Sequence, residues 1–245
     1  MISRETIRMA YRAWRYRVLV DPHEIRFVRK HLSPGDTAVD IGAHKGAYAY
    51  WMHQAVAPHG RVVCFEPQKP MVGYLNRMKE AVPLAQLEVV NLALSSRRGE
   101  MTLAVPQGGS SQGATLESGL LKGPHMLYLV GVTTLDEFFG ADTPVKLIKC
   151  DVEGHEFEVF KGGERLLRKH RPVVLFECED RHHRQQDWRD TFAFLEGLGY
   201  QGAFFTRRGL RSLKEFDPVR HGVPESKEYA NNFAFRFPGP PVRVR

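Results

Sequence analysis

Short apolar runs alternate with segments of helical periodicity along most of this 245-residue chain, and this alternation constrains the fold more than any other feature. The runs lie at 37–41, 61–65, 87–94, 145–150 and 172–177. They are mostly apolar throughout rather than alternating in and out, as expected for strands covered on both faces. Helical repeats such as Met71, Leu75 and Met78 stand between them. The pattern predicts an α/β fold with a mostly parallel sheet and helices on both faces.

The remaining segments suggest one folded domain. Two phenylalanine-rich runs at 201–206 and 232–237 are expected to form an antiparallel pair at a sheet edge. The expected organisation is a basic helical segment at 1–34, a domain at 35–237 and a disordered tail at 238–245. The glycine- and serine-rich stretch from Pro106 to Pro124 predicts a long loop, interpreted as a lid or an acceptor loop. The oligomeric state stays open.

The charge is concentrated near the N-terminus. The formal net charge is +7, which leaves room for an anionic partner. Before residue 31, arginines alternate with Met9, Tyr11, Trp14 and Tyr16. The favoured interpretation is a solvated basic helix that packs its aromatic side on the domain, and a membrane-surface contact is the alternative. No stretch has the length and apolarity of a membrane span or a signal peptide, so the cytoplasm is the expected compartment.

A glycine turn follows the first predicted strand. The sequence Val39-Asp40-Ile41-Gly42-Ala43-His44-Lys45-Gly46 leads from that strand into a helix. In an open α/β sheet, ligands bind at the carboxyl ends of strands. The turn lacks the third glycine of a dinucleotide-binding pattern. The acid at Asp40 would instead suit a cationic group such as the ammonium of S-adenosylmethionine, and Gly42 allows a close backbone approach.

Further cofactor contacts are expected at the next two strand ends. Glu66 ends the second strand, where an acid accepts hydrogen bonds from ribose hydroxyls, and Pro67 then stops the strand. Asn91 and Ala93 could receive the adenine edge. The predicted cofactor site therefore contains Asp40, Gly42, Ala43, His44, Gly46, Glu66, Pro67, Asn91 and Ala93.

These motifs resemble those of a known family. VDIGAHKG, FEP, VVNLALS, TTLDEF and IKCDVEGHE occur in the order found in FkbM-type methyltransferases, over about 35–237. The resemblance implies a Rossmann-like class I methyltransferase fold, with a seven-stranded sheet that ends in an antiparallel hairpin. It also implies S-adenosylmethionine as cofactor and transfer to oxygen, often on sugars or polyketides. His44 and Lys45 depart from the family, which commonly has Asn and an aliphatic residue there.

The catalytic candidates follow the later strands. A hydroxyl acceptor must lose its proton, which a positioned carboxylate or imidazole can assist. Asp151 is favoured for acceptor alignment or proton removal, although it could also cap a helix. Glu153 is a second candidate, and stabilising the next helix is an equally good role for it. Glu179 and His182 follow the next strand, and His182 is kept as a weaker candidate base.

A metal ion is an optional addition to this site. Adjacent strand ends could bring Asp151 and Glu179 together, and hard carboxylate oxygens would suit Mg²⁺. The expected acceptor is a small-molecule or glycan-like hydroxyl on a sugar, a glycolipid or a natural product. The alternatives are a non-catalytic nucleotide- or nucleic-acid-binding module, which the positive charge favours, and a NAD-dependent oxidoreductase. A nucleic-acid acceptor is less favoured because no added RNA-binding domain is visible.

Overall fold

The computed structural model describes residues 4–82, 84–107, 113–117, 119, 121, 123–179 and 188–238. Its main sheet contains the strands β1 Thr37–Ile41, β2 Arg61–Phe65, β3 Leu87–Val90, β7 Leu147–Cys150, β8 Val173–Glu177, β9 Gln201–Thr206, β10 Gly209–Ser212 and β11 Asn232–Arg236. They lie in the order β10, β9, β11, β8, β7, β1, β2, β3. The pairs among β3, β2, β1, β7 and β8 are parallel, whereas β11 pairs antiparallel with both β8 and β9.

This sheet confirms the predicted α/β class and refines its edge. The last two phenylalanine-rich runs do pair antiparallel, but β11 lies inside the sheet between β8 and β9. β10 adds an eighth strand beyond the seven implied by the resemblance. It pairs with β9 across a tight reversal, and Gly209 has a φ of 111° at the point where β10 begins. A left-handed φ of this kind favours glycine at such a turn.

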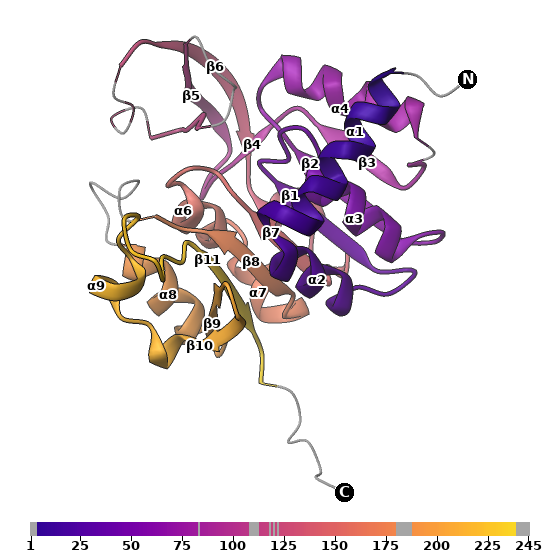
Figure 1. Cartoon of the computed structure of the whole chain (residues 1–245). Helices are drawn as coiled ribbons and strands as arrows, with labels where there is room; N and C mark the ends of the chain where they lie inside the picture. Colours follow the sequence, from indigo (N-terminus) through magenta and orange to yellow (C-terminus); the bar gives the residue numbers. More distant parts are fainter. Residues whose placement is uncertain are drawn as a thin grey trace, which may run out of the picture.

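Helices cover both faces of the main sheet (Figure 1). The helices are α1 Arg4–Arg15, α2 Pro22–His31, α3 Ala47–Val56, α4 Lys69–Ala81, α5 Leu135–Phe139, α6 Glu156–Lys161, α7 Glu164–His170, α8 Trp188–Gly197 and α9 Pro218–His221, with short turns η1 Tyr16–Val20 and η4 Leu213–Glu215. One apolar cluster joins α1–α4 to one face of the sheet, and another joins α5–α8 to the other face. Alternate residues of β1 supply both, since Ala38 belongs to one cluster and Val39 to the other.

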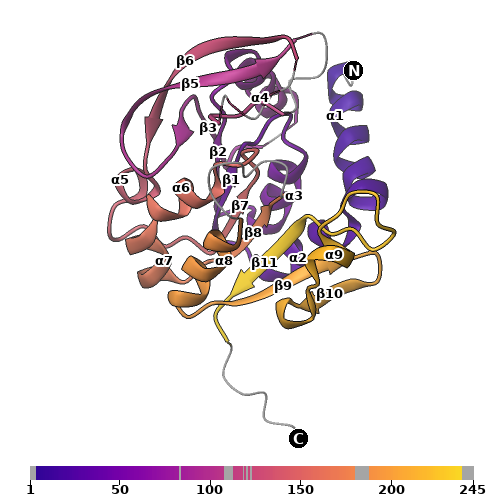
Figure 2. The same cartoon turned by 90° about the vertical axis from the view of Figure 1, so that its left-hand side faces the viewer.

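A second, three-stranded sheet lies beside the main one (Figures 1 and 2). It contains β4 Ala93–Leu94, β5 Gly99–Pro106 and β6 His125–Thr133, in the order β4, β6, β5. The expected single strand at 87–94 is therefore wrong, because the chain leaves the main sheet after Val90 and enters the second sheet at Ala93. The expected loop from Pro106 to Pro124 joins β5 to β6, and residues 108–112, 118, 120 and 122 lie outside the described part.

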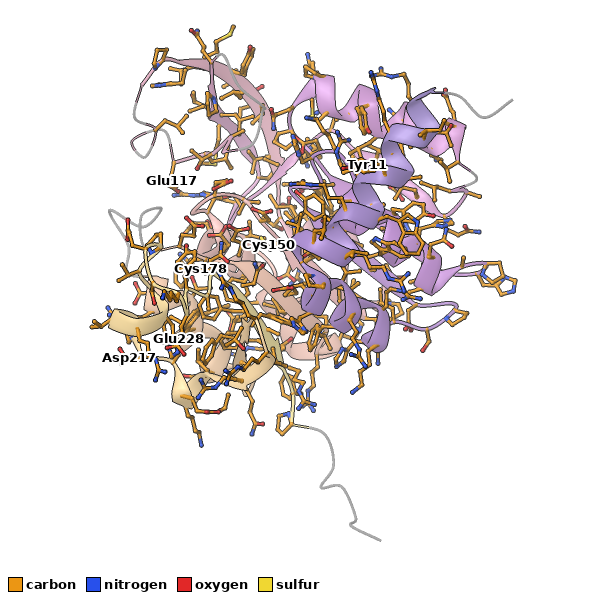
Figure 3. All side chains as sticks on the ribbon, viewed as in Figure 1. Tyr11, Glu117, Cys150, Cys178, Asp217 and Glu228 are labelled. Carbon is orange, nitrogen blue, oxygen red and sulfur yellow. The ribbon has the colours of Figure 1, made fainter. Side chains whose placement is uncertain are left out.

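The N-terminal segment packs on the domain through only part of the expected side, which includes Tyr16. Met9 and Ala13 are buried in the cluster of α1–α4, whereas Tyr11 and Trp14 stay 69% and 50% exposed. Figure 3 labels Tyr11 on α1. The Trp14 ring nevertheless makes a T-shaped contact with Trp51 of α3, at a centroid distance of 5.2 Å. Within the described residues, no helix has the length and apolarity to cross a membrane. The predicted tail beyond Pro238 lies outside the described residues.

Candidate active site

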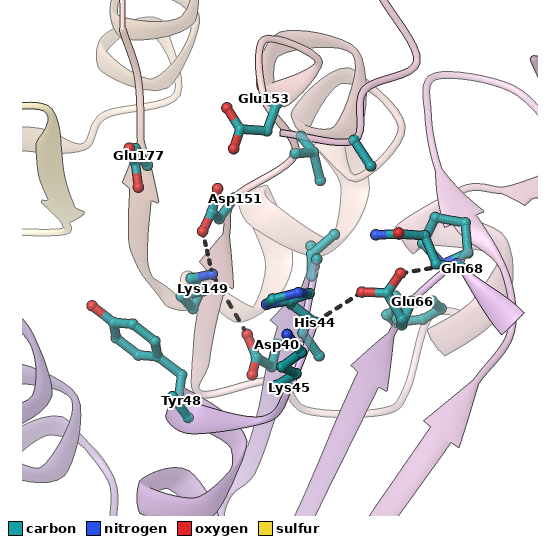
Figure 4. A pocket seen from close by; sticks show the side chains of 18 of the residues that line it. Asp40, His44, Lys45, Tyr48, Glu66, Gln68, Lys149, Asp151, Glu153 and Glu177 are labelled. Atoms are coloured by element: carbon teal, nitrogen blue, oxygen red, sulfur yellow. Dashed lines mark hydrogen bonds and ion pairs between the residues drawn. The ribbon is translucent and has the colours of Figure 1, made fainter. Parts of the chain in front are cut away.

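A pocket of about 380 Å³ opens at the carboxyl ends of β1, β2 and β7. Its floor is the glycine turn at 42–45, and one wall comes from the N-terminal segment through Arg12, Tyr16 and Val20. Leu103 of β5 and residues 113, 114 and 116 of the following loop form another part of its lining. Figure 4 shows its polar side chains. The pocket lies where ligands of open α/β sheets bind.

The glycine turn fits tightly between β2 and β7. The backbone N–H groups of Gly42 and Ala43 donate to Phe65 O at 3.0 and 3.2 Å, which folds the turn over the end of β2. Gly42 has a φ of 73°, and a Cβ there would lie 1.9 Å from the backbone oxygen of Asp151. Any larger residue would push β1 and β7 apart. Gly46, with a φ of 72°, similarly leaves room for Met78 of α4.

Glu66 is held rigidly at the end of β2. One carboxylate oxygen accepts the His44 N–H at 2.8 Å, and the other accepts the Gln68 N–H at 2.9 Å (Figure 4). Burial raises the pKa of Glu66 to about 7, although these two donors oppose the rise. Asn91 donates its side-chain amide to the carbonyls of Glu66 and Pro67, both at 3.0 Å. The carboxylate therefore faces the pocket in a fixed position.

A buried lysine links two acids across β1 and β7. Lys149 stands opposite Asp40 in the strand register. Its Nζ lies 3.0 Å from Asp151 Oδ2 and 3.9 Å from Asp40 Oδ1. Burial acts to lower the pKa of Lys149, but the carboxylates of Asp151 and Asp40 outweigh it and raise that pKa. Lys149 is therefore a permanent cation, and it also lies 5.0 Å from the ring centroid of Tyr48.

Asp40 retains unused hydrogen-bonding capacity. Its side chain is buried, and neither oxygen has a hydrogen-bond partner among the described residues. Burial raises its pKa to about 6, and Lys149 partly opposes this. A buried acid with open acceptor positions beside a pocket is an arrangement that a cationic or hydrogen-donating ligand group would satisfy.

A second acidic group lines the opposite side of the pocket. In Figure 4 the side chains of Asp151, Glu153 and Glu177 approach one another. Burial raises the pKa of Glu177 well above its usual range, and the charges of Asp151 and Glu153 raise it further. This raised pKa favours the protonated form of Glu177, which can donate a hydrogen bond. Asn231 donates to Glu177 at 2.7 Å and to Glu179 at 2.9 Å.

The loop at 113–117 is tied to the segment after β7. Thr115 donates its hydroxyl to the Glu153 carbonyl at 2.7 Å. The buried His155 lies 2.7 Å from a Glu117 oxygen through Nδ1 and 2.9 Å from the Ser95 hydroxyl through Nε2. These contacts place part of the predicted acceptor loop over the pocket, since Gly113, Ala114 and Leu116 line it.

The structure brings most of the predicted site residues to the pocket. Its lining includes Asp40, Gly42, Ala43, His44, Glu66, Pro67, Ala93, Asp151 and Glu153. Gly46, Asn91 and Glu179 are not part of the lining. Gly46 packs against Met78, and Asn91 donates to the Glu66 carbonyl. Glu179 accepts a hydrogen bond from Asn231. His182 lies outside the described residues. The described residues contain no group of three or more ligands that could hold a metal ion, so Mg²⁺ gains no support.

Sequence reasoning missed Lys149, Tyr48 and Gln68, which line the pocket. A signal existed for Lys149, because it stands in an apolar strand two residues before Asp151. Residues two apart in a strand face the same side. Glu177 was passed over in favour of Glu179, but β8 ends at Glu177, and this position reaches the pocket.

Solved structures with a similar fold are methyltransferases. An O-methyltransferase from Bacillus cereus in complex with S-adenosylhomocysteine is 13% identical, with a TM-score of 0.54, and the match covers 96% of this chain and 91% of that one. An rRNA methylase from Streptococcus thermophilus is 9% identical, with a TM-score of 0.51, covering 88% and 95%. At these identities the likeness concerns the fold, which is that of Rossmann-like, S-adenosylmethionine-dependent methyltransferases.

The family is narrower than this fold class. Residues 40–201 match the FkbM methyltransferase domain, so the chain belongs to the FkbM methyltransferase family. A FkbM methyltransferase from Methylobacillus flagellatus KT is 16% identical, with a TM-score of 0.52. The match covers 95% of this chain and spans 55% of the length of that protein. No curated protein matches the sequence.

The predicted ribose contact of Glu66 implies a pH dependence of cofactor binding. A ribose hydroxyl donates best to an ionised carboxylate, and the pKa of Glu66 is about 7 without ligand. Affinity for S-adenosylhomocysteine should therefore rise as the pH rises through 7, by up to tenfold per pH unit below it. Calorimetric titration between pH 6 and 8 measures this. In Glu66→Gln we expect at least about tenfold weaker binding at pH 8 and a much smaller pH slope. An unchanged slope in that variant would assign the effect to another group.

Proposed function

We propose that this protein transfers a methyl group from S-adenosylmethionine to a hydroxyl oxygen of a sugar, a glycolipid or a natural product. The observation that carries this proposal is the pairing of Asp151 with the buried Lys149 inside the pocket. It supplies a fixed carboxylate beside the predicted cofactor turn, with 32% of its side chain exposed toward the acceptor side.

The residues near the glycine turn fit the cofactor. The open acceptor positions of Asp40 suit an ammonium group, and the two-point anchoring of Glu66 suits ribose hydroxyls. Gly42 and Ala43 offer a backbone surface, and Pro67 and Ala93 supply apolar contact. Burial lowers the pKa of His44 to about 4, so this departure from the family adds a neutral ring. When bound, the cofactor supplies a methyl group that its sulfonium has already activated.

The side of the pocket formed by Asp151, Glu153 and Glu177, which we call the acceptor half, needs to align a hydroxyl and remove its proton. The Asp151 carboxylate would accept the hydroxyl proton of the acceptor as that oxygen receives the methyl group from the cofactor. Since Asp151 is partly exposed, this proton can leave to water. Glu177, whose raised pKa favours the protonated form, can donate to a neighbouring hydroxyl of the acceptor and thereby orient it. Alignment supplies most of the acceleration in such a displacement, about 7 to 11 kcal/mol.

The charges of the acceptor half favour a hydroxyl over a phosphate-rich acceptor. Asp151 and Glu153 present carboxylates beside Glu177, and these would repel phosphates. Carboxylates also accept hydrogen bonds readily from polyols. An RNA acceptor is the alternative that the net charge of +7 supports.

Transfer of labelled methyl groups tests this proposal. The purified protein would be incubated with methyl-labelled S-adenosylmethionine and, separately, with sugars, lipid extracts and RNA. We expect label in a hydroxyl-bearing acceptor, in an ether that survives mild alkali. Label that is released by alkali would indicate a carboxyl acceptor, and label in RNA alone would indicate the alternative. Either result would contradict the proposed acceptor.

A further inference from the structure

The first helix carries an apolar stripe that the domain does not cover. Five side chains form it, and their exposed fractions are 59% for Ile7, 69% for Tyr11, 50% for Trp14, 59% for Val18 and 73% for Leu19. We call this set the α1–η1 surface. Positions 7, 11, 14 and 18 repeat at helical spacing, so they share one face. Single exposed apolar residues are ordinary, but a contiguous group of this kind marks an interaction surface.

Arginines border this stripe. Arg8 and Arg15 are exposed on α1, and Arg17 stacks over Trp14 at 4.8 Å from the ring centroid. No acidic residue occurs between Thr6 and Val20. The surface therefore combines aromatic and aliphatic side chains with uncompensated positive charge. Helices that lie in the interface of an anionic membrane have this combination.

The same segment forms a wall of the pocket. Val20 is 39% exposed next to Leu19 and also lines the pocket, together with Tyr16 and Arg12. Arg12 points inward, where it donates to the Tyr74 hydroxyl at 2.6 Å. The apolar stripe thus continues to the pocket at Val20. A surface that binds α1 and η1 would therefore lie at the edge of the active site.

We propose that the α1–η1 surface docks this protein on an anionic phospholipid bilayer, so that the pocket takes its hydroxyl acceptor from molecules carried in that membrane. Other occupants fit less well. A second copy in a two-fold dimer would bring Arg8 and Arg15 of both chains together. RNA would pair with the arginines but would leave Ile7, Val18 and Leu19 without apolar contact. The docking itself is independent of the proposed function, whereas the choice of acceptor rests on it.

Vesicle sedimentation tests the docking directly. The full chain would be mixed with vesicles of phosphatidylcholine alone or with added phosphatidylglycerol, at low and high salt. We expect binding to the anionic vesicles that weakens with salt. Val18→Ser combined with Leu19→Ser should weaken binding about tenfold or more, since both side chains would be buried in the interface. Arg8→Gln combined with Arg15→Gln should weaken it roughly thirtyfold and reduce the salt dependence.

The second sheet provides a matched control. Leu127 and Leu129 of β6 are 59% and 68% exposed, and β6 belongs to the second sheet, which lies apart from α1 in Figure 1. Leu127→Ser combined with Leu129→Ser should leave vesicle binding unchanged. Absence of binding to anionic vesicles, or equal loss in the control, would overturn the proposal. So would RNA binding without vesicle binding, or a dimer that the Val18 and Leu19 changes dissociate.

Cofactor binding separates this proposal from the proposed function. The variants of the α1–η1 surface should bind S-adenosylhomocysteine as the unchanged protein does. Vesicle binding by a protein that fails to bind this ligand would leave the docking intact and contradict the methyltransferase site. For the acceptor, methyl label should enter lipid-soluble products faster on anionic vesicles. Label confined to water-soluble products would overturn the membrane acceptor and leave methyl transfer standing.

Discussion

Asp151→Asn is expected to lower kcat by about 10² to 10⁴, because it removes the group that takes the acceptor proton. The asparagine oxygen can still accept from Lys149, which lies 3.0 Å from Asp151 in the unchanged protein. The local geometry should therefore survive, and the affinity for S-adenosylhomocysteine should change less than about threefold. Steady-state kinetics with the identified acceptor, together with calorimetric titration of the ligand, gives both quantities.

Glu153→Gln is the comparison for this variant. Glu153 lines the same pocket, but the carboxylate that pairs with Lys149 at 3.0 Å is that of Asp151. We expect a smaller loss of kcat than in Asp151→Asn. If the losses were equal, the two acids would act together on the proton. If Asp151→Asn kept its full turnover, Asp151 would have no part in proton removal.

Lys149→Met should produce the largest loss of stability, about 3 to 5 kcal/mol, because it leaves two acids without their buried cation. Asp40 is the more affected acid, since it is almost fully buried and its pKa is already about 6. Without Lys149 this pKa should rise further. The loss of stability arises where Asp40 is ionised, and it disappears as falling pH protonates Asp40. The difference in unfolding free energy between the variant and the unchanged protein should therefore shrink from pH 8 toward pH 5.

Denaturant unfolding across that pH range measures the deficit. The control combines Lys149→Met with Asp40→Asn, which removes the unpaired charge and should recover part of the stability at pH 8. A loss of stability below about 1 kcal/mol is typical of an exposed ion pair, and it would contradict the claim that Lys149 is a buried cation paired with two acids. A deficit that does not change with pH would show that Asp40 does not carry it.

The main sheet could be predicted because its strands are buried on both faces. Runs such as 62–65 and 173–176 are apolar on both faces of the strand, as a sheet covered on both sides requires. The second sheet was not predicted. Its strand β6 also has an apolar sequence, yet Leu127 and Leu129 are exposed. An apolar sequence does not by itself identify a strand or its partner, and β6 pairs with β5, which lies on the other side of the connecting loop in the sequence.

The site could likewise be predicted only in part. Asp40, Gly42 and Glu66 stand at strand ends, and the rule that ligands bind at such ends located them. Lys149 lies inside β7, one residue before the strand ends. Its role depends on Asp40, which is its partner in the neighbouring strand β1. Such a pair is visible only once the register of neighbouring strands is known. The choice between Glu177 and Glu179 likewise required the residue at which β8 ends.

The aromatic residues of α1 illustrate a different limit. Their spacing indicated an amphipathic helix, and the natural expectation was that the aromatic side faces the domain. Instead Met9 and Ala13 are buried and Tyr16 packs against the same cluster, while Tyr11 and Trp14 are exposed. A helix that is apolar on two faces can pack by either one. In the structure the Ala13 carbonyl accepts from the Trp51 indole at 2.8 Å, which holds the Ala13 side of the helix against α3.

The central claim is that the pocket binds S-adenosylmethionine, and the most direct test is thermal unfolding with saturating ligand. Ligand at about 100 times its Kd adds roughly 2.7 kcal/mol, which should raise Tm by about 5 to 10 °C in a chain of this size. We expect this rise with S-adenosylmethionine and with S-adenosylhomocysteine, and no rise with NADH. A rise with NADH alone, or no rise with any of the three, would contradict the claim.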